Sequence, residues 1–445
     1  MTSVAYVSEQ LQFILEERAC ELARETGCIV RQRKFSGADL VQMVVFGFQQ
    51  HPHASLEELA STAEIREVSV SDTAVDKRFT PACARLLHAV LEELTSVVVQ
   101  AAQEVPIRLL RRFSAVILEE SSSIALPDEL AELWRGCGGN QRHTAAAVKL
   151  HTRCELKRGR LEGPKLTDGR TSDHASPFNE QEVVPGSLQV EDLGYFSLER
   201  LAERRRAKAY SLTRYRAGTA LYSIDGQRLQ VARVAPRRVG QMKELHVLVG
   251  AAARLPMRLL LLRVPKKIAG KRREDLLVDA QRRQQPISEE TLRLADWTIL
   301  LTDAPAKGLR FEEALVLLRE RWQMELLYKL WKQHGQVDEW HTADPWRMLC
   351  EFYAKLIGVV LQHWLIVLFA WHDPQRSLVK LAKVVRDTGW TLMEALAGHR
   401  SLRSALRLIA RRMRSGCQMN TRKKHPNSAQ LLEQEAVEWA LSWCE

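Results

Sequence analysis

Apolar residues recur at every third or fourth position from about residue 8 to residue 105, and Ser or Thr precedes the runs, as in HASLEELAS and TPACARLLHAVLEEL. This spacing places apolar side chains on one face of a helix, and the preceding polar residues are typical N-caps. Residues 1–106 are therefore predicted to form a helical domain. Its segment SLEELASTAEIREVSVSDTAVDKRFTP has the turn chemistry of a helix-turn-helix that binds DNA, although a bundle without DNA contacts explains it nearly as well.

Short apolar runs replace the helical pattern after residue 107. AVILEE, at 115–120, predicts a buried strand that ends in two glutamates, the second of which is Glu120. A hairpin follows, and then a second short strand that ends at Asp192, before a helix that opens at Ser197. A charge at the end of a buried strand lies at the rim of a sheet, where sites are usually built. Glu120 and Asp192 are therefore candidate site residues.

The second half of the chain alternates β-type and helical patterns. Residues 208–292 combine the short apolar runs RLQVARVA, KELHVLVGA and MRLLLLRVP, expected as strands, with the basic segments PRRVGQMK and PKKIAGKRRED. This pattern predicts a β-rich insert with basic loops. DWTILLTDAP predicts a strand, and RFEEALVLLRERWQMELLYKLWKQHG predicts a long helix that stops at Gly335. The apolar run at 356–371 is shorter than a bilayer span and has Gln and His at its middle, so a buried helix is expected.

Composition and charge restrict the class of protein. The 445 residues, 46% hydrophobic and 27% charged, suffice for two to four globular domains. A net charge of +11 favours a polyanionic partner such as nucleic acid over a merely basic enzyme. The eight cysteines form no CxxC pair, which argues against a zinc ribbon or a disulfide framework, and the N-terminus lacks the order of a secretory signal. A cytosolic protein is expected.

Three charged residues share one face of the long predicted helix. Arg321, Glu325 and Lys332 lie within about 40° of one another at ~100° per residue, and Lys329 lies at the edge of that face. An exposed face with internal salt bridges explains this pattern when it is taken alone.

The two carboxylates at strand ends change the interpretation. Glu120, Asp192 and Glu325 together could hold two divalent metal ions for phosphodiester chemistry, while the basic residues bind phosphates. Because all three ligands are hard oxygens, Mg²⁺ is the expected ion, with Mn²⁺ as a substitute.

At this point the sequence resembles the DDE insertion-sequence transposases with the Y-R-E-K signature, the insertion-sequence-four family. In that signature Tyr, Arg, Glu and Lys are separated by two, three and six residues. RWQMELLYKLWK resembles it at Arg321, Trp322, Glu325, Lys329 and Lys332. VEDLGYFSLERL resembles the strand of the second family carboxylate and places Asp192 there, and the resemblance extends over residues 75–425.

The resemblance implies an α/β fold: an RNase H-like mixed sheet with flanking helices, interrupted by a β-rich insertion domain. The implied parts are an N-terminal helical domain that binds transposon ends (1–106), a catalytic domain in two parts (107–207 and 293–375), the insertion domain (208–292) and a C-terminal helical region for DNA binding or dimerisation (376–445). Its basic segment at 411–424 could hold DNA or be a solvated linker.

The implied function is cut-and-paste DNA transposition by two-metal phosphoryl transfer: 3′ nicking, hairpin formation and strand transfer. Its metal ligands would be Glu120, Asp192 and Glu325, with two Mg²⁺ ions. The residues expected to contact DNA are Arg214, Trp297, Arg321, Trp322, Lys329 and Lys332, with Trp297 stacking on a base. The expected partners are the terminal inverted repeats, target DNA and a second copy of the chain, in the bacterial cytosol at the nucleoid and without a membrane.

Some alternatives stay open. Trp297 could be a sheet-edge residue and Arg214 a plain surface charge. The chain also departs from the family at Glu120, where the family has Asp, and at Leu318, where it has Tyr. An extra methylene moves a carboxylate by about 1 Å, which predicts reduced activity. A catalytically inactive protein that binds transposon ends, and a nuclease without strand transfer, are the alternative functions.

Overall fold

The computed structural model describes residues 2–31, 35–138 and 145–419, without the side chains of residues 282–283 and 319–326. The chain forms two compact units. Unit 1 contains the described chain up to Pro106, Ser121–Thr171, and the described chain from Glu325 onward. Unit 2 contains Ile107–Glu120 and Ser172–Met324.

The N-terminal part of unit 1 is helical, as predicted. Its elements are α1 (Val4–Gln12), the π-helix η1 (Phe13–Arg18), α2 (Ala19–Glu25), α3 (Gly37–Gln50), α4 (Leu56–Ala63), the 3-10 turn η2 (Glu64–Arg66), α5 (Asp72–Asp76) and α6 (Pro81–Ser96). Polar N-caps start these helices: Ser36 and Ser55 form capping boxes, and Thr80 caps α6 before Pro81. The sequence signals for helix starts are therefore confirmed.

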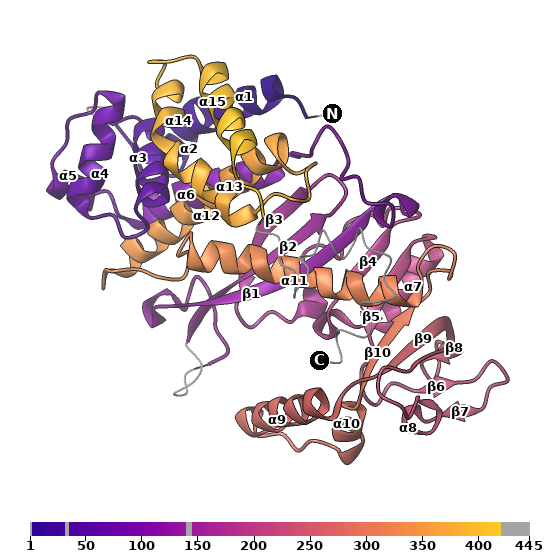
Figure 1. Cartoon of the computed structure of the whole chain (residues 1–445). Helices are drawn as coiled ribbons and strands as arrows, with labels where there is room; N and C mark the ends of the chain where they lie inside the picture. The colour runs from indigo at the N-terminus through magenta and orange to yellow at the C-terminus, as the bar shows by residue number, and fades with distance from the viewer. Residues whose placement is uncertain (1, 32–34, 139–144, 420–445) are drawn as a thin grey trace. The chain divides into compact units, whose positions relative to one another are not determined.

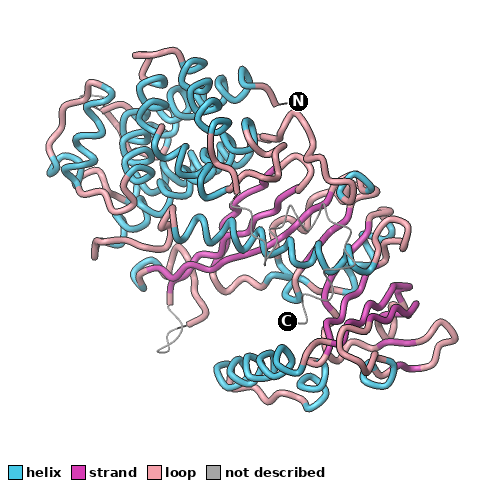
Figure 2. Tube along the Cα trace, in the orientation of Figure 1, coloured by secondary structure: helices cyan, strands magenta, loops and turns pink. Residues whose placement is uncertain are grey.

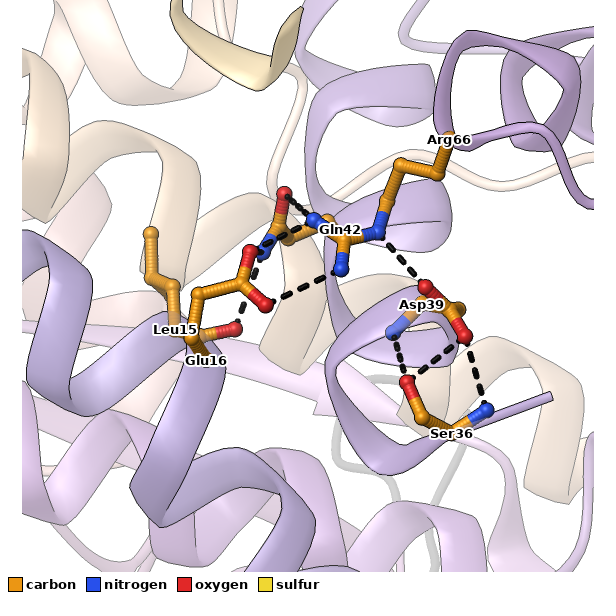
Figure 3. A network of polar contacts seen from close by, with 6 residues as sticks. All are labelled: Leu15, Glu16, Ser36, Asp39, Gln42 and Arg66. Atoms are coloured by element: carbon orange, nitrogen blue, oxygen red, sulfur yellow. Dashed lines mark hydrogen bonds and ion pairs between the residues drawn. The ribbon is translucent and has the colours of Figure 1, made fainter. Parts of the chain in front are cut away.

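A polar network holds the end of α4 to the neighbouring helices (Figure 3). Arg66 donates to both carboxylate oxygens of Glu16, to Asp39 at 2.6 Å and to the side-chain oxygen of Gln42 at 2.8 Å. These side chains are largely buried, and charge-assisted bonds of this kind are stronger than neutral ones. The network fixes the start of the α4–α5 connection, within the segment predicted to be helix-turn-helix-like.

The C-terminal part of unit 1 is also helical. It contains α12 (Pro345–Phe369), α13 (Leu378–Asp387), α14 (Gly389–Leu396) and α15 (Leu402–Ser415). Helix α12 packs against α3 and α6 (Figure 1). It is long and apolar enough to cross a membrane, but 89% of its most apolar window is buried inside the protein. The expectation of a buried helix at 356–371 is confirmed, although the helix ends at Phe369.

Unit 2 is built on a mixed sheet. In hydrogen-bonded order its strands are β1 (Val116–Leu126, in this unit up to Glu120), β4 (Leu188–Glu191), β5 (Tyr210–Arg214), β10 (Trp297–Thr302), β9 (Leu255–Arg263), β8 (Met242–Val249), β6 (Leu221–Tyr222) and β7 (Arg228–Leu229). Strands β1, β4 and β5 are parallel, and β10 is antiparallel to β5 and β9. The mixed α/β class is as predicted. Strands β8 and β9, from the predicted insert, continue the sheet beyond β10.

In unit 1, the antiparallel pair β2 (Ala146–Glu155) and β3 (Arg160–Asp168) forms the predicted hairpin, in the order β3-β2-β1. Strand β1 does not end at its glutamates, as the sequence analysis expected, but runs on to Leu126. The reason is that its later residues alternate, with Ile124 and Leu126 buried and Ser123 exposed, so the strand pattern outlasts the polar cluster.

Two parts of the insert differ from their prediction. The segment PKKIAGKRRED, expected as a basic loop, lies in helix α9 (Lys266–Arg283), which precedes α10 (Glu289–Leu294) between β9 and β10 (Figure 2). Lys, Arg, Glu and Leu are good helix formers, so dense charge does not imply a loop. The segment RLQVARVA is not a strand, because β7 ends at Leu229 and helix α8 (Val231–Val234) follows.

Candidate active site

Strands β1 and β4 bring two candidate carboxylates together. Their register is parallel, with Leu118 opposite Val190. Strand β4 ends at Glu191, and Asp192 is the next residue. Because residues two apart on a strand point to the same face, Glu120 lies on the face of Leu118, and this register continued by two residues would set it beside Asp192. Glu120 and Asp192 are both half-buried. The joint role of Glu120 and Asp192 as metal ligands stays a prediction.

The next strand adds a positive charge on this face. In the parallel register of β4 and β5, Val190 lies opposite Leu212, and Arg214 lies two residues beyond Leu212 on the same face. Arg214 is the last residue of β5 and is exposed. An exposed guanidinium at the end of this strand suits the binding of a phosphate. The contact of Arg214 with DNA stays a prediction.

The opposite face has a different chemistry. Glu119 is 2% exposed and accepts a hydrogen bond from the Ser176 hydroxyl at 2.5 Å. Glu191 forms a bidentate ion pair with Arg204 of α7 (Leu198–Arg206). Burial by itself would lower the pKa of Arg204, but the Glu191 carboxylate more than offsets this, and the pKa is raised. Because these carboxylates face α7, Glu119 does not lie on the face of Glu120, as strand geometry predicts.

A further carboxylate lies near Arg204. Asp303, directly after β10, accepts a hydrogen bond from the Ser211 backbone N–H at 2.7 Å, and its charge acts on Arg204. Burial raises the pKa of Asp303. Neither Asp303 nor Arg204 was predicted from the sequence. In the run ERRRAK, no feature distinguishes Arg204 from the exposed Arg205 and Arg206.

The signature positions lie on one continuous helix, α11 (Phe311–Gln333), as predicted. Three predicted site residues have side chains outside the described part of the structure: Arg321, Trp322 and Glu325. Lys329 is exposed, and Lys332 pairs with Asp338 at 3.6 Å. Leu318, at the signature tyrosine position, is 7% exposed and so serves the packing of the helix.

Trp297 begins β10 and is half-buried in the apolar cluster of the insert strands. Its indole N–H donates to the Pro236 carbonyl at 2.8 Å, and the Arg263 guanidinium lies 4.6 Å from the ring centre. These contacts are the ones expected if Trp297 is a structural residue at the sheet edge. A base that stacked on the same ring face would have to replace Arg263, so base stacking stays a prediction.

The predicted metal ligands can be compared with the arrangement of acidic and metal-binding side chains in the described residues. No group of three or more His, Cys, Asp or Glu side chains among them is arranged to hold a metal ion. The predicted ligands Glu120, in β1, and Asp192, directly after β4, are hard oxygen donors of the kind that Mg²⁺ and Mn²⁺ prefer. The third predicted ligand, Glu325, has its side chain outside the described part of the structure.

The family is decided by comparison with known proteins. Residues 112–361, more than half of the chain, match the family described as "Transposase DDE domain". The chain belongs to the DDE transposase family. The match includes Glu120, Asp192 and all of α11. Transposases of this family generally use divalent metal ions, in agreement with the oxygen donors described above.

Relatives of this transposase span most of its length. The transposase for insertion sequence element IS231F of Bacillus thuringiensis subsp. israelensis is 24% identical, over 80% of this chain and 78% of its own. The transposase for IS1151 of Clostridium perfringens is 20% identical, over 77% and 76%. The transposase for IS421 of Escherichia coli is 23% identical, over 76% and 88%.

Among solved structures, a piggyBac transposase synaptic complex with hairpin DNA aligns with a TM-score of 0.46 and 10% sequence identity. The alignment covers 96% of this chain and 87% of that chain.

Proposed function

We propose that this transposase performs cut-and-paste transposition of an insertion sequence, as a member of the insertion-sequence-four family with an RNase H-like catalytic core. The observation that supports this most strongly is the parallel register of β1, β4 and β5, which, continued past its last pairs, would bring Glu120, Asp192 and Arg214 to one sheet face. Carboxylates held close together can bind the metal ions that phosphoryl transfer uses.

The roles follow from the chemistry of each residue. Glu120, Asp192 and Glu325 would hold two Mg²⁺ ions, which activate the attacking oxygen and stabilise the leaving oxygen of the phosphodiester. The residues that bind and orient the DNA are Arg214, Trp297, Arg321, Trp322, Lys329 and Lys332. Guanidinium and ammonium groups bind phosphate oxygens, and an aromatic ring offers a surface for an unstacked base. Lys332 is partly occupied by Asp338 in the DNA-free protein, so DNA has to compete with that pair.

The reaction course is part of the same proposal. The enzyme would nick at the 3′ end of the element, form a hairpin on the released end and transfer the strand to target DNA. It would act as a homodimer on paired terminal inverted repeats, in the bacterial cytosol at the nucleoid. Glu120 in place of the family aspartate would reduce the rate, because an extra methylene displaces the carboxylate by about 1 Å in a site that depends on geometry.

The test is excision from a supercoiled donor plasmid that carries the element's own ends, in Mg²⁺ and in Mn²⁺. Asp192→Ala and Glu325→Ala should abolish excision, and Glu120→Asp should raise its rate by up to about a hundredfold. Glu199→Gln is the matched control, because this exposed carboxylate lies on α7 and not on the strand face with Glu120. Its rate should equal that of the unaltered chain.

Three results would contradict the proposal. Full excision by Asp192→Ala would show that Asp192, directly after β4, is not a metal ligand. Full excision by Glu120→Ala would show that Glu120 is not a ligand. If neither the unaltered chain nor Glu120→Asp cleaves, although both bind the ends, the catalytic assignment fails. Nicking and hairpin formation are separated by running the products on denaturing gels.

A further inference from the structure

Helix α15 has a row of arginines that the proposed active site does not use. Arg403, Arg407, Arg411 and Arg414 follow one another at spacings of four, four and three residues. At ~100° per residue these positions stay within an arc of about 80°, so the four side chains share one face. With a rise of ~1.5 Å per residue, the row is roughly 16 Å long. The helix, LRSALRLIARRMRS, contains no acidic residue. We call these four residues the arginine row.

Within the described part of the chain, no carboxylate lies within ion-pair distance of the arginine row, and all four side chains are exposed. Neighbouring arginines behave differently. Arg412, on another side of α15, lies 3.5 Å from Asp387, and Arg400, before the helix, lies 3.0 Å from Glu394. Among the residues that the structure describes, the arginine row therefore forms no internal ion pair.

The opposite face of α15 is buried. Its buried residues are Ala405, Leu406, Ile409, Ala410 and Met413, and the helix packs against α1, α13 and α14 of the same unit (Figure 1). A helix that binds a membrane surface needs its apolar face for the lipid. Because this face is already covered by protein, the amphipathic pattern of α15 does not indicate a membrane helix.

The C-terminal end of α15 is anchored. Arg376 donates to the carbonyls of Met413, Arg414 and Gly416, at 2.5, 2.9 and 2.5 Å. Its guanidinium also pairs with Asp373 at 2.8 Å. These bonds satisfy carbonyls that a helix end leaves without partners, and they place a positive charge where the helix dipole is negative. The arginine row is therefore displayed from a helix fixed at its end as well as along its buried face.

We propose that the arginine row binds the phosphate backbone of double-stranded DNA without reading its sequence. Phosphates of one strand succeed one another at ~3.4 Å along the duplex axis, so roughly five of them span the length of the row. Four guanidinium groups without acidic neighbours match such a line of charge, and guanidinium is well suited to phosphate oxygens. This inference rests on the proposed function only in taking DNA as the substrate, and it does not involve the carboxylates.

The test measures binding of the full chain to a 30-base-pair duplex without the element's ends, by fluorescence anisotropy between 50 and 300 mM KCl. The slope of log Kobs against log salt should lose up to about 3.6 when all four arginines become alanine, since each phosphate contact contributes ~0.9. A single Arg407→Ala should lose about 0.9 of the slope. At 100 mM KCl the fourfold alanine variant should bind on the order of 10³-fold more weakly.

Two controls separate charge from other effects. A variant with lysine at all four positions keeps the charge and should keep the salt slope. Arg412→Ala removes an arginine that is paired with Asp387, so its slope should stay that of the unaltered chain. Circular dichroism melting and sedimentation of each variant report folding and the oligomeric state.

An unchanged slope in a folded fourfold alanine variant would overturn the proposal. Loss of self-association with unchanged DNA binding would also overturn it, because the row would then be a contact between copies of the chain. The proposed function is tested separately: it fails if the Asp192→Ala and Glu325→Ala variants still excise the element.

Discussion

Replacing Arg204 with methionine tests the buried ion pair that backs the candidate active site. Arg204 reaches from α7 to Glu191, the last residue of β4, and Asp192 is the next residue along the chain. Methionine has an unbranched apolar side chain, so the substitution removes the positive charge of Arg204. The buried Glu191 carboxylate is then left without a counter-charge. We expect a large loss of local stability around the end of β4.

The magnitude follows from the burial of both partners. The side chains of Arg204 and Glu191 are only 3% and 5% exposed, and the contact is bidentate. Removing one partner of such a buried pair costs about 3–5 kcal/mol, because the remaining charge stays desolvated. At ~1.4 kcal/mol per tenfold, the populations of open states should rise by about 10² to 10⁴.

Hydrogen exchange with mass spectrometry measures this effect where it is expected. Peptides that cover β4 and α7 should exchange faster by the same factor, while peptides from α12 in unit 1 serve as the internal reference. The double variant Arg204→Met/Glu191→Leu removes both charges, so it should recover most of the lost stability. The coupling between the two substitutions gives the size of the stranded-charge effect.

Two results would refute this reasoning. If Arg204→Met raises exchange in β4 by less than tenfold, the pair does not stabilise the end of the strand. If the double variant is as unstable as the single one, the loss comes from packing and not from the stranded carboxylate of Glu191.

Three further predictions concern unit 1. His363 donates to the Gly159 carbonyl at 2.8 Å, and burial lowers its pKa from 6.5 to about 4. Between these pKa values the unfolded chain binds a proton that the native chain does not, so the free energy of unfolding should fall by up to ~3 kcal/mol from pH 6.5 to pH 4. In urea unfolding, His363→Gln should make the free energy of unfolding less dependent on pH. An unchanged pH dependence would contradict this prediction. Gly159→Ala should lower stability by about 2–4 kcal/mol, because the new Cβ would lie 2.3 Å from the Trp371 ring at a φ of +69°; an unchanged melting temperature would contradict this. Lys355→Met strands the buried Glu351, its partner at 2.6 Å, and should cost about 3–5 kcal/mol, largely recovered by the double variant Lys355→Met/Glu351→Leu in urea titrations; a double variant no more stable than the single would contradict it.

Much of the local structure could be predicted from the sequence. Helix starts such as Ser36 and Ser55 depend on hydrogen bonds within four residues, so their signals lie in the neighbouring residues. The same holds for the long helix α11, whose residue spacing also indicated the signature and the candidate Glu325. Dense charge was the weak point of this approach, because the lysines and arginines of α9 suit a helix as well as a loop.

The pairing of Glu120 with Asp192 depends on the tertiary structure. Their likeness to a signature suggested it, and the register of β1 against β4, continued past Leu118 and Val190, would bring them to one sheet face. The same register turns Glu119 and Glu191 to the other face, where Arg204 meets them. The side-chain period of a strand is two, so a register slip of one residue would exchange these faces. The local sequence pattern identified the acidic candidates. Packing between distant segments decided which of them share a face of the sheet.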